Sequence, residues 1–511
     1  MPRARGGMSV RIACVGGGPG GLFLATLIKR ARPEHEVVVF ERNGADDTFG
    51  FGVVFSDRTL DGIHDADPVL RHALAEHGRH WDEIEVRIKG ERLRCGGNGM
   101  AALSRRTLLA LLQERAREAG AELRFGTEAQ LDDLDGFDLI VACDGANSRI
   151  RQRYAEIFEP SAETATAKFI WLGTDYQFDG LTFIHERGPH GVFAVHGYPI
   201  SDKVGTFIVE TDEASWRAAG LDGFDPAQPP GVSDLKSRDY LQELFGERID
   251  GHQLLVNNSR WASFHTRRAR RWRHANVVLL GDAAHTAHFS VGSGTKMAME
   301  DAIALSAALE THPGDLDAAL AAYEATARPA VDRIQDAARP SLSWWEHFGA
   351  YHDAFEPWQF AFHFMSRSIT AGRLRRRAPE FVDATLREWQ RRHGAPPLHT
   401  PLRVGDHLLP GRVLAGPPEW ATPVAAPQDE RDVAAIVAAV PDGGAVAVHG
   451  GTPLTRTLVS ERVRFGRGLP AILVDDDLDT DAALTVILSG RADLVASATA
   501  TSEMNDAPTA R

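Results

Sequence analysis

A glycine-rich turn near the start of the chain constrains the fold more than any other feature. Residues 10–15 form an apolar strand, residues 16–21 (GGGPGG) follow at once, and an apolar helical run begins at Leu22. Gly16, Gly18 and Gly21 have the G-x-G-x-x-G spacing. In this motif the first glycine permits a tight turn, the second lets the backbone approach a pyrophosphate, and the third lets the helix pack on the strand. The phosphates of a dinucleotide then face the helix N-terminus.

A second predicted strand supports the same site. Residues 36–40 end at Glu41, about 20 residues past the glycines, where a carboxylate can accept hydrogen bonds from an adenosine ribose. No second unit of strand, glycine turn and helix occurs in the sequence. We therefore expect one dinucleotide-binding domain and no separate nicotinamide domain.

Length, charge and cysteine content exclude several classes of protein. The 511 residues suffice for about three domains, and the formal net charge of −14 argues against nucleic-acid binding. Three cysteines predict neither a disulfide framework nor a metal site, so we expect no metal and a reducing, cytoplasmic location. No apolar run approaches the roughly 18 residues of a membrane span, so we expect no membrane partner.

Two later motifs narrow the class. Residues 138–144 form a predicted buried strand that ends in the turn Asp144-Gly145, and residues 277–282 form another that ends in Gly281-Asp282. Together with the glycine turn they resemble the three fingerprints of the para-hydroxybenzoate hydroxylase-like (group A) flavin monooxygenases. The resemblance implies bound FAD, with NADH or NADPH as a transient reductant. It also implies an α/β fold, in which an antiparallel β-sheet for substrate is inserted into a Rossmann-like FAD-binding domain.

The same resemblance assigns residues to FAD. Asp282 is expected on the ribityl chain, and Arg105, at the start of a helix, near the phosphates. A glycine-rich turn at residues 291–295 leads into a helix whose N-terminus stabilises the negative charge of reduced flavin. The full predicted set is Gly16, Gly18, Pro19, Gly20, Gly21, Glu41, Arg42, Arg105, Asp144, Asp282, Gly292, Gly294 and Thr295.

Short β-rich runs at residues 168–173, 181–184, 191–195 and 206–210, separated by turn residues, predict the antiparallel sheet. We divide the chain accordingly into four parts. The FAD-binding domain comprises 8–75, 100–155 and 275–330, and the substrate-binding sheet domain 76–99 and 156–274. A C-terminal helical segment spans 331–396 and a short α/β tail 397–511.

A narrower resemblance concerns the substrate. Residues 41–57, 169–174, 207–211 and 281–290 are similar to the branch of the family that hydroxylates aryl-CoA thioesters. The implied reaction, with O2, is 5-hydroxylation of salicylyl-CoA to gentisyl-CoA. Hydroxylation of 2-aminobenzoyl-CoA, or of a free or carrier-bound aromatic acid, stays open. Two other functions also stay open: a flavoprotein dehydrogenase or reductase, and a non-catalytic flavin-binding partner protein. A homodimer stays open as the oligomeric state.

Single residues near the Gly-Asp motif are candidates for catalysis. His288 and Phe289 are expected near the flavin, where His288 could orient or deprotonate a phenol, since the usual pKa of histidine is near 6.5. It is equally consistent with the sequence that His288 only shapes the pocket. His285 is expected to be structural. Residues 344–364 form an aromatic helical stretch that is more typical of a core than of a ligand site.

Two arginine clusters could bind the phosphates of coenzyme A through charge-assisted bonds. One precedes the Gly-Asp strand at residues 267–273, and plain surface charge is an alternative for both. We favour the cluster that follows the aromatic stretch, namely Arg373, Arg375, Arg376 and Arg377.

The tail resembles only the opening and closing strands of an old-yellow-enzyme barrel. Its roughly 110 residues cannot form a (β/α)8 barrel, which typically needs about 250. We therefore expect a remnant that binds no FMN and has a structural role at most, with its last dozen residues disordered.

Overall fold

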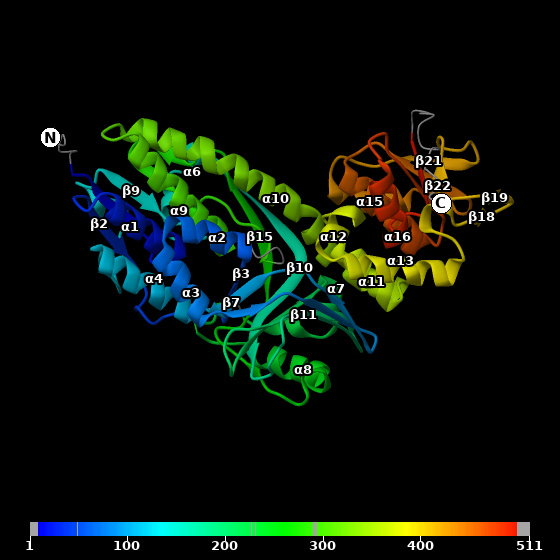
Figure 1. The fold of residues 1–511 in the computed structure, drawn as a ribbon, viewed down its shortest axis with the longest axis horizontal. Helices are drawn as coiled ribbons and strands as arrows, with labels where there is room; N and C mark the ends of the chain where they lie inside the picture. Colours follow the sequence, from blue (N-terminus) through cyan, green and yellow to red (C-terminus); the bar gives the residue numbers. More distant parts are fainter. Residues whose placement is uncertain (1–8, 49, 226, 230, 290–293, 498–511) are drawn as a thin grey trace. The chain divides into compact units, whose positions relative to one another are not determined.

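The structure is a computed structural model that describes residues 9–48, 50–225, 227–229, 231–289 and 294–497 (Figure 1). The predicted disordered C-terminus therefore lies outside the described residues. The chain forms two compact units. Unit 1 comprises Met1–Ile84 and Asn98–Glu346, and unit 2 comprises Glu85–Gly97 and His347–Arg511.

A six-stranded sheet in unit 1 carries the glycine turn. Its order is β16-β17-β9-β1-β2-β8, and every pair is parallel except β16 with β17. Ile12, Ala13 and Cys14 of the central strand are fully buried, as expected for a parallel sheet covered on both faces. The strands are β1 (Arg11–Val15), β2 (Glu36–Phe40), β8 (Glu122–Arg124), β9 (Leu139–Ala142), β16 (Arg273–His274) and β17 (Val277–Leu279).

Three helices of this unit pack beside one another at the sheet: α1 (Pro19–Ala31), α4 (Arg105–Ala119) and α9 (Gly294–Thr311). Leu22, Phe23 and Leu24 of α1 are fully buried in the same core as the strands. Ser104 caps α4, since its side chain accepts a hydrogen bond from the backbone of Thr107. The cap fixes where α4 begins and so where Arg105 stands.

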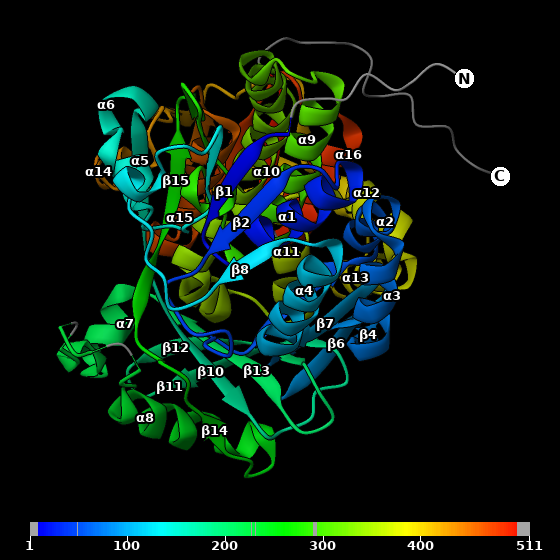
Figure 2. The same ribbon diagram turned by 90° about the vertical axis from the view of Figure 1, so that its left-hand side faces the viewer.

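An antiparallel sheet in unit 1 follows the order β14-β10-β13-β12-β11, with β15 paired to β10. Leu241 and Phe245 of α8 (Leu235–Phe245) pack on one face of it against Phe193 and Phe207. Figure 2 shows α8 and α7 (Glu213–Ala218) on the side of this sheet remote from β1 and β2. The strands are β10 (Pro160–Thr174), β11 (Leu181–Gly188), β12 (Gly191–Pro199), β13 (Gly205–Thr211), β14 (Leu254–Leu255) and β15 (Ala262–Ala269).

The predicted fold class is confirmed: a Rossmann-like α/β domain carries an inserted antiparallel sheet, followed by helices and a short α/β tail. The four predicted domain bounds stay a prediction. By contacts between Cα atoms, residues 85–97 group with unit 2, and the border between the units falls inside α10 (Leu316–Ala354).

The tail of unit 2 forms an open sheet of five parallel strands, in the order β20-β24-β23-β22-β21. Val446 and Val448 of β22 face α14 (Val433–Ala438) and α15 (Pro453–Arg467), while Ala445 and Ala447 face the opposite side. The strands are β20 (Val413–Leu414), β21 (Ala421–Ala425), β22 (Ala445–His449), β23 (Ala471–Val474) and β24 (Leu494–Ala496).

Ligands of open α/β sheets bind beyond the carboxyl ends of the strands. In unit 2, β23 is followed there by Asp475, Asp476 and Asp477. Asp475 pairs with Arg456 at 2.5 Å, and the carboxylates still outnumber this cation, which disfavours a phosphate such as that of FMN.

The strands β5 (Ile84–Ile88) and β6 (Glu91–Cys95) bring an early piece of the sequence into unit 2. Lys89 donates a hydrogen bond to the backbone oxygen of Phe355 at 2.7 Å, and β6 packs against α11 (Pro357–Met365) and α13 (Pro379–His393). Unit 2 is therefore assembled from two segments that lie far apart in the chain.

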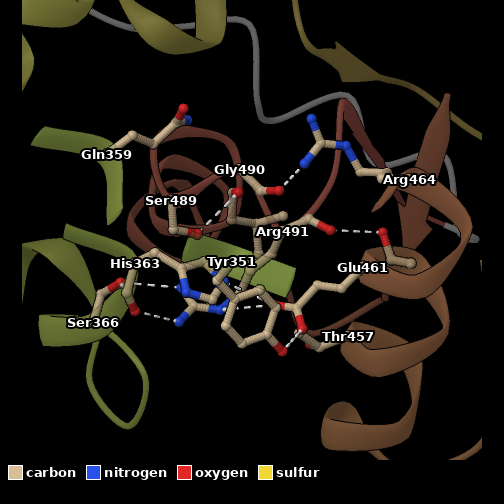
Figure 3. Close-up of polar contacts among 12 residues, drawn as sticks. Tyr351, Gln359, His363, Ser366, Thr457, Glu461, Arg464, Ser489, Gly490 and Arg491 are labelled. Atoms are coloured by element: carbon tan, nitrogen blue, oxygen red, sulfur yellow. Dashed lines mark hydrogen bonds and ion pairs between the residues drawn. The ribbon is translucent and has the colours of Figure 1, made fainter. Parts of the chain in front are cut away.

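A buried charged network lies inside unit 2 (Figure 3). One oxygen of Glu461 accepts a hydrogen bond from the hydroxyl of Tyr351 at 2.5 Å, and the other accepts one from Nε2 of His363 at 3.0 Å. Arg491 donates to the backbone oxygen of His363 at 2.9 Å and to the hydroxyl of Ser366 at 3.0 Å. The guanidinium Nε of Arg491 lies 3.7 Å from Glu461.

Burial and partners shift the ionisation of this network. Burial alone would raise the pKa of Glu461, but His363 and Arg491 outweigh it and hold the pKa below its usual value. Burial, helped by Arg491, lowers the pKa of His363 to about 4. At neutral pH the network therefore holds an ionised Glu461, a neutral His363 and a charged Arg491.

Candidate functional site

The glycine turn has the geometry that a bound pyrophosphate requires. Gly16 has φ +118°, and a Cβ atom there would lie 2.1 Å from the backbone oxygen of Cys143. A Cβ on Gly21 would lie 2.3 Å from the oxygen of Gly16. A Cβ on Gly18 would meet no atom within 4 Å. The first and third glycines thus serve the turn and the packing, while the second opens onto free space.

A cavity of about 370 Å³ lies at this turn, and its lining includes five of the predicted FAD residues: Gly16, Gly18, Glu41, Arg42 and Asp144. It therefore joins the glycine turn, the end of β2 and the Asp-Gly turn after β9. Pro19 stands at the first position of α1, and a Cβ on Gly20 would come within 2.6 Å of Leu280, so both belong to the start of the helix.

The polar groups of this cavity fit a nucleotide. Glu41 accepts hydrogen bonds from the backbone of Gly17 and of Asn43, each at 2.8 Å, which fixes its carboxylate beside the turn. One oxygen of Asp144 accepts from the backbone of Arg149 at 2.8 Å. Its other oxygen is buried without a hydrogen-bond partner, which is costly unless a ligand donates to it.

Asp282 and Arg105 come together at a second part of the site. The side chain of Asp282 is exposed, yet enough protein surrounds it that loss of hydration raises its pKa, against the opposing charges of His285 and Arg105. Burial likewise lowers the pKa of Arg105, and Asp282 is the largest opposing influence. Asp282 thus offers a carboxylate that can accept hydrogen bonds from the hydroxyl groups of a ligand, and Arg105 offers a cation that can bind its phosphate.

Arg151 joins the two aspartate motifs and was not singled out as a site residue. Its guanidinium donates to the backbone oxygen of Ala283 at 2.8 Å and to that of Ala146 at 2.6 Å. His285 bonds Asp301 at 2.7 Å, and the same oxygen of Asp301 accepts from the backbone of Gly281 at 2.8 Å. These bonds hold the Gly-Asp turn in place.

The helix expected beside the flavin is α9, which begins at Gly294 and Thr295. Its first turn carries no acidic side chain, so the positive end of its dipole is not neutralised from within the helix. Gly292 lies outside the described residues.

His288 belongs to a buried cluster that the sequence did not predict. Glu210 bridges two imidazoles: Nε2 of His196 lies 2.6 Å from one carboxylate oxygen and Nε2 of His288 lies 3.1 Å from the other. The three side chains are at most 4% exposed. Burial acts to raise the pKa of Glu210, but His288 and His196 outweigh it and hold the pKa at about 2.

Phe289 packs this cluster into an aromatic environment. Its ring centroid lies 4.3 Å from that of His288, 5.5 Å from that of His196 and 5.0 Å from that of Phe169. Trp345 lies 4.3 Å from His196 on another side. The two imidazoles and the carboxylate between them are thus packed against aromatic rings.

The four predicted CoA-binding arginines lie on or near the surface of α12 (Ala371–Arg377) in unit 2. Arg375 pairs with Asp383 at 2.8 Å, whereas Arg373, Arg376 and Arg377 pair with no carboxylate among the described residues. In the rival cluster, arginines 268, 270 and 273 each have a carboxylate within 3.0 Å. The α12 cluster therefore has more uncompensated charge to offer an anion.

Two absences apply to the described part of the chain. None of its helices is long and apolar enough to cross a membrane. No three of its His, Cys, Asp and Glu side chains are arranged to hold a metal ion.

The fold and site define a dinucleotide-binding enzyme with an inserted substrate sheet. Residues 9–338 match the family described as FAD binding domain, and the chain belongs to this family. It is 57% identical to a salicyloyl-CoA 5-hydroxylase of a Streptomyces species, over 95% of this chain and 99% of that one. The chain is therefore a flavin-dependent monooxygenase that uses FAD.

Two other similarities cover about two thirds of this chain. A 3-hydroxy-4-methyl-anthranilyl-[aryl-carrier protein] 5-monooxygenase of Streptosporangium sibiricum is 37% identical, over 66% of this chain and 89% of its own. A solved structure of 2-methyl-3-hydroxypyridine-5-carboxylic acid oxygenase has a TM-score of 0.55 at 20% identity, covering 71% of this chain and 99% of that one. The similarity to this solved structure shows the fold alone.

Proposed function

We propose that this monooxygenase hydroxylates the ring of an aryl-CoA thioester, with salicylyl-CoA converted to gentisyl-CoA as the first candidate. The supporting observation is the 57% identity to a salicyloyl-CoA 5-hydroxylase across nearly the whole of both chains. The reaction balances as aryl-CoA, O2, NAD(P)H and H⁺ giving hydroxyaryl-CoA, NAD(P)⁺ and water. A cytoplasmic location and a homodimer stay predictions.

The residues of unit 1 fit FAD. Gly16 to Gly21, Glu41, Arg42 and Asp144 would hold the adenosine and pyrophosphate, Arg105 the phosphates and Asp282 the ribityl chain. Bound FAD, reduced by NADH or NADPH, supplies the activated oxygen. The protein itself orients the ring and excludes water, which would otherwise divert the oxygen to peroxide.

His288 and Phe289 would contact the aromatic ring. Phe289 offers a face against which a planar substrate can pack, and His288 beside it can hold or accept the proton of a ring hydroxyl. Such a contact activates the ring, because an oxygen that loses its proton donates more electron density to it.

A substrate screen tests the proposed function. We expect NAD(P)H oxidation to be stimulated by hydroxyaryl-CoA thioesters and much less by the free acids, with one hydroxylated product per O2 consumed. Product formation without O2 would instead indicate a flavoprotein dehydrogenase or reductase. Equal rates of NAD(P)H oxidation with the free acids and their thioesters would instead indicate a monooxygenase that acts on free aromatic acids.

We further propose that Arg373, Arg375, Arg376 and Arg377 bind the CoA phosphates. CoA carries several negative charges to a protein of net charge −14, so a concentrated positive patch is needed. Arg376→Ala and the double variant with Arg375→Ala should raise KM for the thioester roughly ten- to hundredfold, because each charge-assisted bond is lost.

The value of kcat should change less, since an anchor away from the reacting atoms acts alike on ground and transition states. Steady-state kinetics would measure both constants, with the exposed Arg403→Ala of the same unit as the matched control. An unchanged KM in the double variant would show that this cluster is solvated surface.

A further inference from the structure

The carboxylate of Glu210 is shared by two imidazoles and by no other charged group. Nε2 of His196 lies 2.6 Å and Nε2 of His288 3.1 Å from its two oxygens, and no lysine or arginine among the described residues pairs with it. Glu210 is 1% exposed. A buried carboxylate without a permanent cation is electrostatically unfavourable, and a proton on either imidazole would supply the missing counter-charge.

The geometry also sets where that proton can go. Glu210 is ionised at neutral pH, since its pKa is about 2. An imidazole that bonds an ionised carboxylate through Nε2 keeps its hydrogen on Nε2, so in the neutral form Nδ1 is the acceptor nitrogen. With both imidazoles neutral the cluster has a charge of −1, and one added proton makes it neutral.

Aromatic rings surround the imidazole of His196. The ring of His196 lies 4.3 Å from that of Trp345, 5.0 Å from that of Phe183 and 5.5 Å from that of Phe289. The carboxylate of Glu210 orients both imidazoles and supplies a counter-charge for a proton on either of them, as in other histidine–carboxylate pairs. The ring of His185 stacks on that of Trp345, with their centroids 6.0 Å apart.

We propose that His288, positioned by Glu210 and His196, takes the proton of the ring hydroxyl, and that this cluster selects 2-hydroxyaryl over 2-aminoaryl thioesters. The inference rests on the proposed function. In the step, the O–H bond of the substrate breaks, an N–H bond forms on the imidazole, and the electron pair stays on the ring oxygen. A neutral ring amine is far too weak an acid to give a proton to imidazole, so it gains nothing from this base.

Glu210→Gln tests the proposal, because it keeps the shape of the side chain and removes its charge. We expect kcat/KM with salicylyl-CoA to fall about 100-fold or more, the usual size of a general-base contribution. With 2-aminobenzoyl-CoA the fall should stay below about threefold. The exposed Glu247→Gln serves as the matched control and should alter neither.

A binding measurement gives a second readout without turnover. Salicylyl-CoA mixed anaerobically with the oxidised enzyme should show the absorbance of a phenolate when bound to the native protein, and of a phenol when bound to Glu210→Gln. If Glu210→Gln loses FAD and cannot be used, His196→Asn takes its place, with the same selective loss expected.

The outcomes separate this inference from the proposed function. Equal losses on both thioesters, or a phenolate spectrum that persists in the variant, would overturn the role of Glu210 while leaving hydroxylation of aryl-CoA intact. If the native enzyme hydroxylates neither thioester, the proposed function fails first. If the native enzyme hydroxylates only salicylyl-CoA, the binding measurement tests the role of Glu210. A phenol spectrum in Glu210→Gln supports that role, and a phenolate spectrum overturns it.

Discussion

Gly16→Ala is expected to destabilise the folded apoprotein and to abolish FAD retention. The new Cβ would lie 2.1 Å from the backbone oxygen of Cys143, and the φ of +118° is one that alanine rarely adopts. Backbone strain and overpacking each cost about 1 to 3 kcal/mol, so the two together should lower the free energy of unfolding by about 2 to 6 kcal/mol. Thermal unfolding of the apoprotein and the flavin absorbance after gel filtration measure the two effects.

Gly18→Ala is the matched control for this change. Its Cβ would meet no atom within 4 Å and its φ of −76° is ordinary, so the apoprotein should keep its stability. FAD should nevertheless bind more weakly, because the methyl group enters the space expected for the pyrophosphate. Normal FAD affinity in Gly18→Ala would contradict the assigned phosphate position, and a fully stable Gly16→Ala would contradict the close contact with Cys143.

Glu461→Ala should have the largest effect on unit 2. The change leaves the buried Arg491 without its carboxylate and removes the acceptor of both Tyr351 and His363. Breaking a buried ion pair by removing one partner typically costs about 3 to 5 kcal/mol, because an uncompensated charge remains. Hydrogen exchange of peptides from α15 and β23 would localise the loss, and the exposed Glu419→Ala provides the control.

The same network makes unit 2 sensitive to acid. His363 has a pKa of about 4 in the folded state, below the ordinary 6.5, so the fold favours its neutral form. Its contribution to stability is complete above about pH 6.5 and is lost as the pH falls toward 4, by about 3 kcal/mol. The lowered pKa of Glu461 adds a further loss below about pH 4.5. Exchange rates in unit 2 that do not change between pH 7 and 4 would contradict this account.

The parts of the fold that repeat a local pattern were predictable. The glycine turn, the acid at the end of β2 and the two aspartate turns each occupy a few adjacent residues, and all of them were assigned to FAD. The cavity at the glycine turn is lined by five of the residues assigned to FAD, namely Gly16, Gly18, Glu41, Arg42 and Asp144. The assigned roles of single residues toward FAD, substrate and CoA stay predictions.

Glu210 and His196 were missed because their proximity depends on strand register. Glu210 ends the predicted run 206–210, and His196 directly follows the run 191–195. Both runs were read as plain strands of the sheet. The pairing of β12 with β13 places His196 opposite Ile208 and Ala194 opposite Glu210. His196 and Glu210 are therefore diagonal neighbours on one face, within reach of each other.

The extent of β10 was underestimated for a related reason. The strand begins at Pro160, eight residues before the predicted start, and its early part is polar and exposed. Pairing with β15 defines this part of the strand, from Pro160 opposite Ala269 to Thr164 opposite His265. Hydrophobic alternation cannot reveal a strand whose side chains face water on both sides.

Unit 2 is built from two segments that lie far apart in the chain, and this affects how the protein folds. The bond from Lys89 to Phe355 spans 266 positions of sequence, so the contacts of β5 and β6 with the helices of unit 2 can form only after most of the chain has been made. Ribosomes add about 5 to 20 residues each second, which delays these contacts of the β5–β6 hairpin by some tens of seconds. Its closing step should depend on translation speed and on chaperones, and a circular permutant that begins near residue 98 would remove the delay.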